Sequence, residues 1–283
     1  MSGNVLFDAP GPRTIARHRV YTGITLLAIL GLVLLIVGKL NETGQLEYAK
    51  WEPFVTPDYV RVLLVDGLLK TLEMAFFAII FAVVVGLALG VGKLSEHRWI
   101  RLPSFLVVEF FRAIPVLLLM IFIFYMLSVG DGPLSSFWCV VLALTLYNGS
   151  VLAEVFRAGV NAVPHGQVEA AYALGLRKTQ VMTIIQLPQA VKIMLPAVVS
   201  QCVVALKDTT LGVYILAPGL TFISKQIYLQ FFNQVPTAIV VAALFIACNL
   251  ILTWIAHMLQ RRLTGEKSAP AVPTGDGAGA GTF

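Results

Sequence analysis

Six long apolar stretches restrict the fold of this chain more than any other feature, because a helix of about 20 apolar residues crosses the hydrocarbon of a membrane. None alternates apolar with polar residues as a membrane strand would, so all six are predicted to be helical. The chain is 58% hydrophobic and only 12% charged, whereas soluble domains carry about 25% charged residues. The sequence therefore predicts an all-α integral membrane protein. The predicted membrane helices are 20–40, 68–91, 106–127, 137–156, 193–216 and 237–258.

The two ends of the chain are expected to differ from this core. Three arginines precede the first apolar stretch, as in a signal peptide, but the apolar run is too long and Gly38-Lys39-Leu40-Asn41 is no cleavage site. We predict a cytoplasmic segment over 1–19 and a retained membrane helix over 20–40. The Ala/Pro/Gly-rich stretch 264–283 cannot build a core, and we predict a disordered cytoplasmic tail.

Lysines and arginines collect in four places, all of which fall on one side of the predicted helices. Basic residues mark the cytoplasmic side of bacterial membrane proteins, so both termini and the loop after the fourth helix are expected there. This asymmetry accounts for the sequence pI of 9.2 without a nucleic-acid partner. The four groups are Arg13, Arg17 and Arg19; Lys93, Arg98 and Arg101; Arg157, Arg177, Lys178 and Lys192; and Arg261, Arg262 and Lys267.

The loop at 163–190 has the pattern of a compact helix-turn-helix. Pro164 suits a helix entry, and strong helix formers fill 167–174. Gly175 suits the left-handed position that ends a helix. An apolar face follows over 181–187, and Pro188 is expected to break the second helix. Taken alone, Glu-Ala-Ala is also typical of an ordinary helical hairpin.

The full spacing is more specific than those three letters. Gly175 is the fourth residue after Glu169-Ala170-Ala171, and Ile185-Gln186-Leu187-Pro188 follows nine residues later. This resembles the EAA loop of ABC importer permeases of the polar amino-acid type, within a permease domain expected over 60–263. In that family the loop docks on a separate ATPase. The resemblance thus implies a five-helix core with the 20–40 helix added in front. The implied coupling residues are Glu169, Ala170, Ala171, Gly175, Ile185, Leu187 and Pro188.

The same resemblance implies the partners. They are an ATPase dimer that binds ATP and magnesium, a second identical or related permease, an extracytoplasmic solute-binding protein and a polar amino acid. The chain is most similar to actinobacterial glutamate permeases. It is expected to hold no catalytic residue, cofactor or metal, and Gly92-Lys93 lacks the spacing of a phosphate loop. Ala82, Gly86 and Gly90 instead form a ladder of small residues that lets another helix approach closely.

Charged residues inside apolar stretches are costly and need partners or water. Glu109 and Arg112 lie three residues apart and are expected to pair at the membrane boundary, with Pro115 kinking the helix. A gating role for these three remains open. Glu154 is expected to pair with Arg157 in the same way.

Further polar residues are candidates for the substrate pathway. The run Lys207-Asp208-Thr209-Thr210-Leu211 resembles the Lys-Asp-Thr-Ser-Leu stretch of polar amino-acid permeases, and either an internal ion pair or a pathway role fits it. The pathway set is Asn148, Glu154, Gln201, Lys207, Asp208 and Thr209.

Two other classes of function use the same residues. In an ion-coupled secondary transporter or channel, Glu154, Lys207 and Asp208 would relay ions, but the sequence has no internal repeat of the kind common there. A nontransporting membrane scaffold would use the 163–190 loop to recruit a partner. This alternative gives no role to the charged residues inside the apolar stretches.

Overall fold

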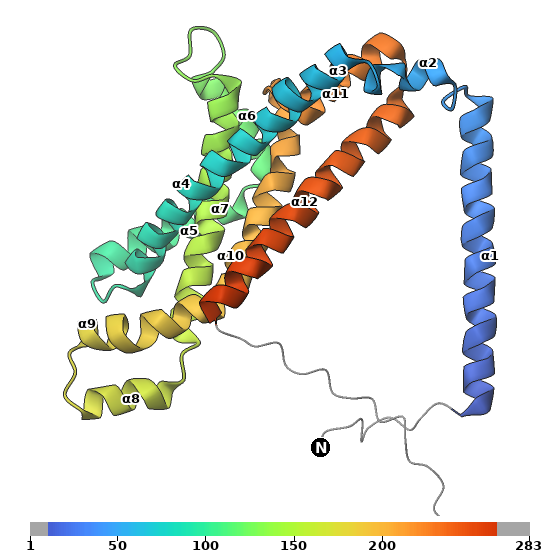
Figure 1. Ribbon diagram of the computed structural model, residues 1–283. Coiled ribbons are helices and arrows are strands. Elements are labelled where there is room, and N and C mark those ends of the chain that lie inside the picture. The colour runs from blue at the N-terminus through green and yellow to red at the C-terminus, as the bar shows by residue number, and fades with distance from the viewer. Residues whose placement is uncertain (1–10, 265–283) are drawn as a thin grey trace, which may run out of the picture.

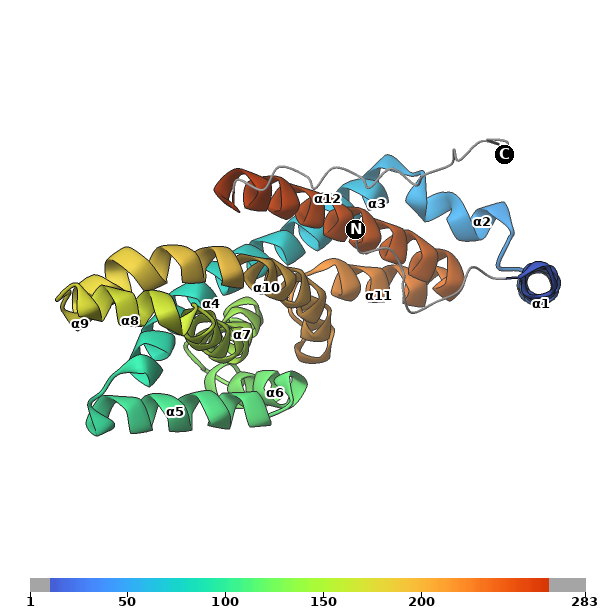
Figure 2. The ribbon, with the colours of Figure 1, turned by 90° about the horizontal axis from the view of Figure 1, so that it is seen from below.

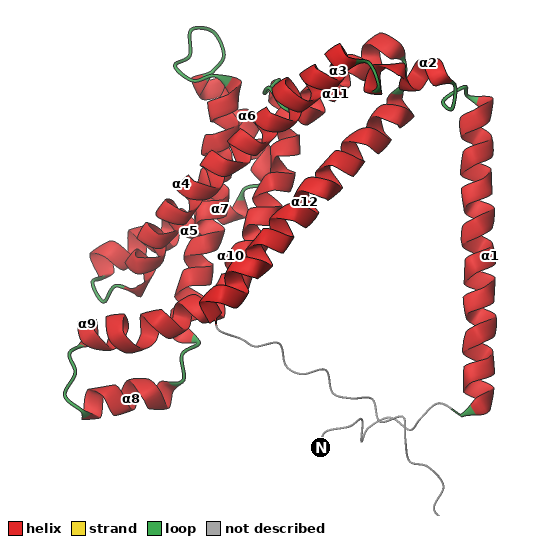
Figure 3. Cartoon of the chain, in the orientation of Figure 1, coloured by secondary structure: helices red, strands yellow, loops and turns green. Residues whose placement is uncertain are grey.

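A computed structural model describes residues 11–264, and within that range every regular element is a helix (Figure 3). The prediction of an all-α membrane protein is confirmed. Five helical stretches are long and apolar enough to cross a membrane, or six if one bent pair counts as a single span. The helices are α1 (Pro12–Glu42), α2 (Tyr48–Trp51), α3 (Pro57–Val62), α4 (Lys70–Leu94), α5 (Arg98–Ala113), α6 (Val116–Leu127), α7 (Ser136–Asn161), α8 (His165–Ala173), α9 (Lys178–Gln180), α10 (Leu187–Asp208), α11 (Leu220–Phe231) and α12 (Gln234–Thr264).

The helices α4 and α7 form the centre of the bundle (Figures 1 and 2). Viewed from below in Figure 2, α5 and α6 lie on one side of this pair, while α10, α11 and α12 lie on the other. The helix α1 stands apart, and its apolar side chains are exposed all round. A helix that is apolar on every face suits direct contact with lipid.

The predicted ladder of small residues is where α4 meets α7. A Cβ added at Gly86 would lie 2.8 Å from the Cβ of Leu152 and 3.0 Å from the carbonyl oxygen of Gly149. One added at Gly90 would lie 3.1 Å from the carbonyl oxygen of Ala153. The two backbones approach so closely because glycine carries no side chain.

The third predicted helix, 106–127, is wrong as a single continuous span, whereas the kink predicted at Pro115 is confirmed and is a complete break. The chain forms α5 and α6 there, and the two helices are bent by 101° at the break beside Pro115. Proline biases the residue before it away from helical geometry, and Ile114 accordingly has extended angles (φ −84°, ψ 127°). With 12 residues, α6 is about 18 Å long at 1.5 Å per residue, too short to cross the hydrocarbon alone.

The predicted break at Pro188 is also wrong. Residues 178–215 form one uninterrupted helical stretch, in which Val181–Gln186 adopts wider turns just before the proline. A proline ring clashes with the carbonyl four residues earlier, and a widened turn relieves that clash. The side-chain amide of Gln189 also donates a hydrogen bond to the carbonyl of Ile185 at 2.8 Å.

The loop predicted between the fifth and sixth helices also contains more structure than expected. Residues 220–231 form α11, whose Leu220 and Ile227 are buried against Leu63. Thr71, at the start of α4, accepts a 2.8 Å hydrogen bond from the amide of Leu220. These contacts position α11 against residues 63–71, around the start of α4, at the end opposite α8 and α9 (Figure 1).

The described residues of the four predicted basic groups fall at one end of the protein. The first turn of α1, the junction of α4 and α5, the α8–α9 hairpin and the last turn of α12 all lie at the lower end of Figure 1. The predicted tail at 264–283 lies beyond the described residues, except for its first position, as does the first part of the predicted 1–19 segment.

Candidate functional site

The loop predicted to contact an ATPase forms a helical hairpin that projects from the ends of α7 and α10 (Figure 1). Its first arm is α8, and its turn is Gly175 with φ +81°. The amide of Gly175 donates to the carbonyl of Tyr172 at 2.9 Å, and that of Leu176 to the carbonyl of Ala171 at 3.2 Å. This pair of bonds is the Schellman arrangement that ends a helix through a left-handed residue. The left-handed turn predicted at Gly175 is confirmed.

The predicted coupling residues divide into exposed and buried ones. Glu169, Ala170, Gly175, Leu187 and Pro188 are exposed, and Ile185 is half-buried. Ala171 is only 4% exposed and faces the body of the protein, so its small size serves packing rather than contact.

Sequence reasoning missed a surface residue beside this turn. Leu174 is 82% exposed, and Tyr172 and Ile184 are also exposed. An apolar patch on a segment that projects beyond the bundle favours a protein partner. The signal was present in the sequence, because Leu174 is a large apolar residue directly before the glycine predicted to turn the hairpin.

Two contacts hold the hairpin against the membrane helices. Val160, Val163 and Ala190 form a buried cluster at its base, against which Leu94 and Val168 pack. Lys178, at the start of α9, forms an ion pair with Glu96 in the α4–α5 junction. The hydrogen bond from Lys178 lowers the pKa of Glu96 below its usual value of 4.5. The hairpin is therefore tied both to α7 and α10 and to the end of α4.

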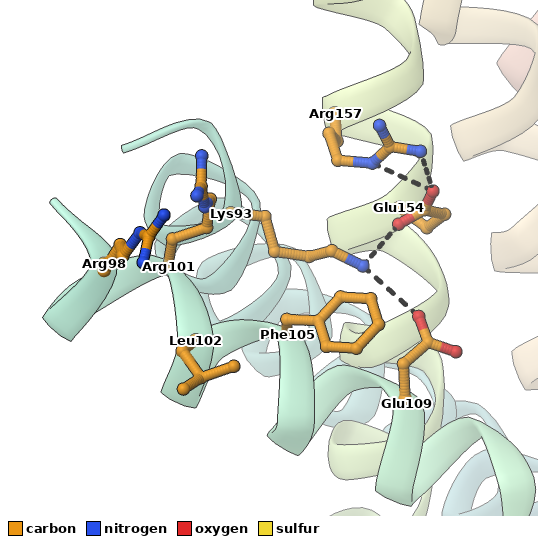
Figure 4. A pocket seen from close by; sticks show the side chains of 8 residues that line it. All are labelled: Lys93, Arg98, Arg101, Leu102, Phe105, Glu109, Glu154 and Arg157. Atoms are coloured by element: carbon orange, nitrogen blue, oxygen red, sulfur yellow. Dashed lines mark hydrogen bonds and ion pairs between the residues drawn. The ribbon is translucent and has the colours of Figure 1, made fainter. Parts of the chain in front are cut away.

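A charge cluster lies at the same end, between α4, α5 and α7 (Figure 4). The Lys93 Nζ lies 2.7 Å from Glu154 Oε2 and 3.3 Å from Glu109 Oε1. Arg157 donates to Glu154 through Nε at 2.9 Å, and Arg112 lies 3.4 Å from Glu109. The two i,i+3 pairs expected from the sequence are confirmed, and Lys93 joins them into one network across three helices.

The sequence indicates for Lys93 only a place among the basic residues of the cytoplasmic side. Its side chain is 5% exposed, and its ammonium also lies 5.0 Å from the centre of the Phe105 ring. A signal was available, because Lys93 follows Gly90 by three residues and so lies on the helix face that carries Gly86 and Gly90. That face packs on α7, where Glu154 lies.

The predicted pathway residues do not form one group. Asn148 and Gln201 meet between α7 and α10, where the Gln201 amide donates to the Asn148 side-chain oxygen at 2.6 Å. Glu154 lies six residues along α7 from Asn148, about 9 Å toward the basic end. Lys207 and Asp208 lie six and seven residues along α10 from Gln201, about 10 Å in the opposite direction.

No ion pair forms between Lys207 and Asp208, and within residues 11–264 neither side chain has another charged partner. Lys207 is exposed and Asp208 is half-buried. The buried Thr209 donates to the carbonyl of Leu206 at 2.7 Å. The internal ion pair considered for this run is therefore wrong.

One protein family matches a stretch of this chain that includes both the helical core and the projecting hairpin. Residues 78–265 match the family described as the binding-protein-dependent transport system inner membrane component. The chain belongs to this family. Its members are multi-pass inner-membrane components of ABC transporters, with a transport role rather than an enzymatic one.

Relatives of known name support this membership. The chain is 43% identical over 237 residues to the glutamate transport system permease protein GluD of Corynebacterium glutamicum, covering 81% of this chain and 85% of that one. It is 34% identical to a probable glutamine ABC transporter permease of Bacillus subtilis, covering 70% and 93% of the two chains.

Solved structures show a similar fold. An amino acid ABC transporter crystallised with histidines superposes with a TM-score of 0.67 at 30% identity, covering 71% of this chain and 94% of that chain. A methionine ABC transporter, MetNI, superposes with a TM-score of 0.63 at 21% identity, covering 74% and 100%, which is a likeness of fold alone.

Proposed function

We propose that this chain is the permease subunit of an ABC importer that carries glutamate into the cell, with the α8–α9 hairpin as its docking element for a separate ATPase. The observation that carries the proposal is this hairpin, which projects from the basic end of a chain in the binding-protein-dependent permease family. In this assignment ATP and magnesium bind to the ATPase, and this chain moves the substrate.

The geometry of the hairpin supports the docking role. Glu169 and Ala170 on α8 and Leu174 at the turn are exposed together, so a partner has both polar and apolar groups to contact. The tight turn and the buried base fix the direction of α8 relative to α7 and α10. Movement of an ATPase bound there would therefore pass to the membrane helices rather than be lost in a flexible loop.

The choice of substrate rests on the named relatives. The 43% identical Corynebacterium protein is a glutamate permease, and the Bacillus protein is named for glutamine. Among the polar groups near the middle of α7 and α10, the half-buried Gln201 is suited to contact a polar substrate, and the buried Asn148 holds its side chain in place. Lys207, Asp208 and Thr209 line the pathway nearer the opposite end in this proposal, and Glu109, Arg112 and Pro115 serve its gate.

Orientation and partners follow from the same proposal. The basic end, with the hairpin and both chain termini, faces the cytoplasm by the positive-inside rule. The opposite end, which carries α2, α3 and α11, faces an extracytoplasmic solute-binding protein. A second permease, identical or related, completes the pathway.

The test uses two glycines of the same hairpin. Gly175 and Gly166 both have open space around an added Cβ, but only Gly175 has a left-handed backbone. A β-branched residue is disfavoured at positive φ. Gly175→Val should therefore re-aim α8 and uncouple ATP hydrolysis from glutamate uptake in proteoliposomes, while Gly166→Val keeps both.

Coupled transport by Gly175→Val at the level of Gly166→Val would contradict the docking role. Glutamate uptake by the permease without an ATPase partner would instead support the secondary-transporter alternative. Stable assembly with the ATPase but no uptake of any amino acid would support the scaffold.

A further inference from the structure

A cavity of about 620 Å³ opens between α4, α5 and α7 at the basic end (Figure 4). Four cationic side chains line it, against two carboxylates. The lining is Lys93, Arg98, Arg101, Leu102, Phe105, Glu109, Glu154 and Arg157.

The two carboxylates are already neutralised from within the protein. Glu154 is held by Lys93 and Arg157, and Glu109 by Lys93 and Arg112. Arg98 and Arg101 have no acidic partner in the described part of the chain. Each guanidinium offers five N–H donors in a planar fork that matches the oxygens of a phosphate group. The cavity thus has the charge and the donors for an added phosphate anion.

The surroundings of the two arginines indicate where that anion comes from. Trp99, beside Arg98, is 92% exposed, and Leu106 and Phe110 continue the same apolar stripe of α5. Arg98, Arg101 and Glu109 share a different face, which borders the cavity. An amphipathic helix with tryptophan on its apolar face and arginine on its polar face is suited to the boundary between headgroups and acyl chains.

We propose that Arg98 and Arg101 bind the phosphate headgroup of an anionic phospholipid, whose acyl chains lie along the exposed apolar stripe of α5. Basic pockets between membrane helices bind such headgroups on the cytoplasmic side. The lipid would sit against the Lys93 network and close to the Glu96–Lys178 contact of the hairpin. This inference goes beyond the proposed transport activity and uses neither substrate nor nucleotide.

The test measures phospholipid binding to the assembled transporter in detergent, by native mass spectrometry during titration with phosphatidylglycerol. The double variant Arg98→Gln/Arg101→Gln should bind about 30-fold more weakly, because it removes two contacts of about 1 kcal/mol each to the bound headgroup. The matched control Arg13→Gln/Arg17→Gln removes the same charge from the basic end of α1, outside the cavity, and should keep the wild-type affinity. Phosphatidylcholine, which carries no net charge, should bind weakly to all three proteins.

Equal affinity of the cavity variant and the wild type would overturn the proposal, as would an equal loss in the α1 control. Displacement of phosphatidylglycerol by millimolar inorganic phosphate would assign the site to a free anion and overturn the lipid source. If the double glutamine variant does not assemble, Arg98→Lys/Arg101→Lys provides the measurement. That variant keeps both charges but loses the planar fork, so it should bind more weakly than wild type by a smaller factor, and unchanged binding would count against the site.

Discussion

The contact between α4 and α7 gives the sharpest test of the helical core. Replacing Gly86 by alanine puts a methyl group 2.8 Å from the Leu152 Cβ and 3.0 Å from the Gly149 carbonyl oxygen. Ordinary contact begins at 3.4 Å, so one neighbour must move by about 0.6 Å, the difference between 3.4 and 2.8 Å. Both contacted atoms belong to the backbone or lie next to it and cannot rotate away. The two helices must therefore separate.

The expected cost of this overpacking is about 1–3 kcal/mol. At about 2–4 °C per kcal/mol for a chain of this size, the thermal midpoint of the detergent-solubilised transporter should fall by about 2–12 °C. Gly38→Ala in α1 is the matched control, since nothing lies within 4 Å of an added Cβ there. That change should leave the midpoint equal or slightly raised, because alanine is the better helix former.

The two variants share the same chemistry and differ only in what the new methyl group meets. A Gly86→Ala protein as stable as Gly38→Ala would refute the close approach of α4 and α7. A fall in both midpoints would indicate that glycine flexibility, rather than contact, is what both helices require.

Three further predictions concern the polar contacts. Lys93→Met should lower the thermal midpoint by an amount equivalent to about 1–3 kcal/mol, and the loss is no larger because Glu109 and Glu154 each keep an arginine partner. The control Lys39→Met breaks only the exposed pair with Glu42 and should change the midpoint little. Equal effects of the two substitutions would contradict the buried network. In a double-mutant cycle, Asn148→Ala and Gln201→Ala should show a coupling of about 0.6 kcal/mol, as helix–helix hydrogen bonds in membranes do, and additive losses would contradict the 2.6 Å bond. A carbon-13 NMR titration should place the pKa of Glu96 below 4.5, so the ion pair to Lys178 is formed at neutral pH and is lost only as the pH falls through that lowered value. Lys178→Gln should return the pKa of Glu96 to about 4.5. An unchanged pKa in that variant would argue against the contact.

The sequence by itself determined those features that depend on neighbours along the chain. Segment length and hydropathy predicted the five continuous membrane helices, and the i,i+3 spacing predicted the pairs Glu109–Arg112 and Glu154–Arg157. Gly175 was predicted as a left-handed turn, because few other residues adopt that backbone cheaply. The small residues at 82, 86 and 90 predicted a close helix contact without identifying the partner helix.

Only the tertiary structure decided which helices meet and what their meeting buries. Lys93 links Glu109 and Glu154, which lie 16 and 61 residues from it along the chain. They meet because α4, α5 and α7 converge at one end of the bundle. Glu154 on α7 and Lys207 and Asp208 on α10 lie toward opposite ends of the bundle from the Asn148–Gln201 contact, because α7 and α10 run in opposite directions. Both Pro115 and Pro188 predict an interruption of a helix, but Pro115 separates α5 from α6, whereas Pro188 lies within a continuous helical stretch. Proline removes one hydrogen bond in both places, and the surrounding turns determine whether the chain bends or widens to accommodate it.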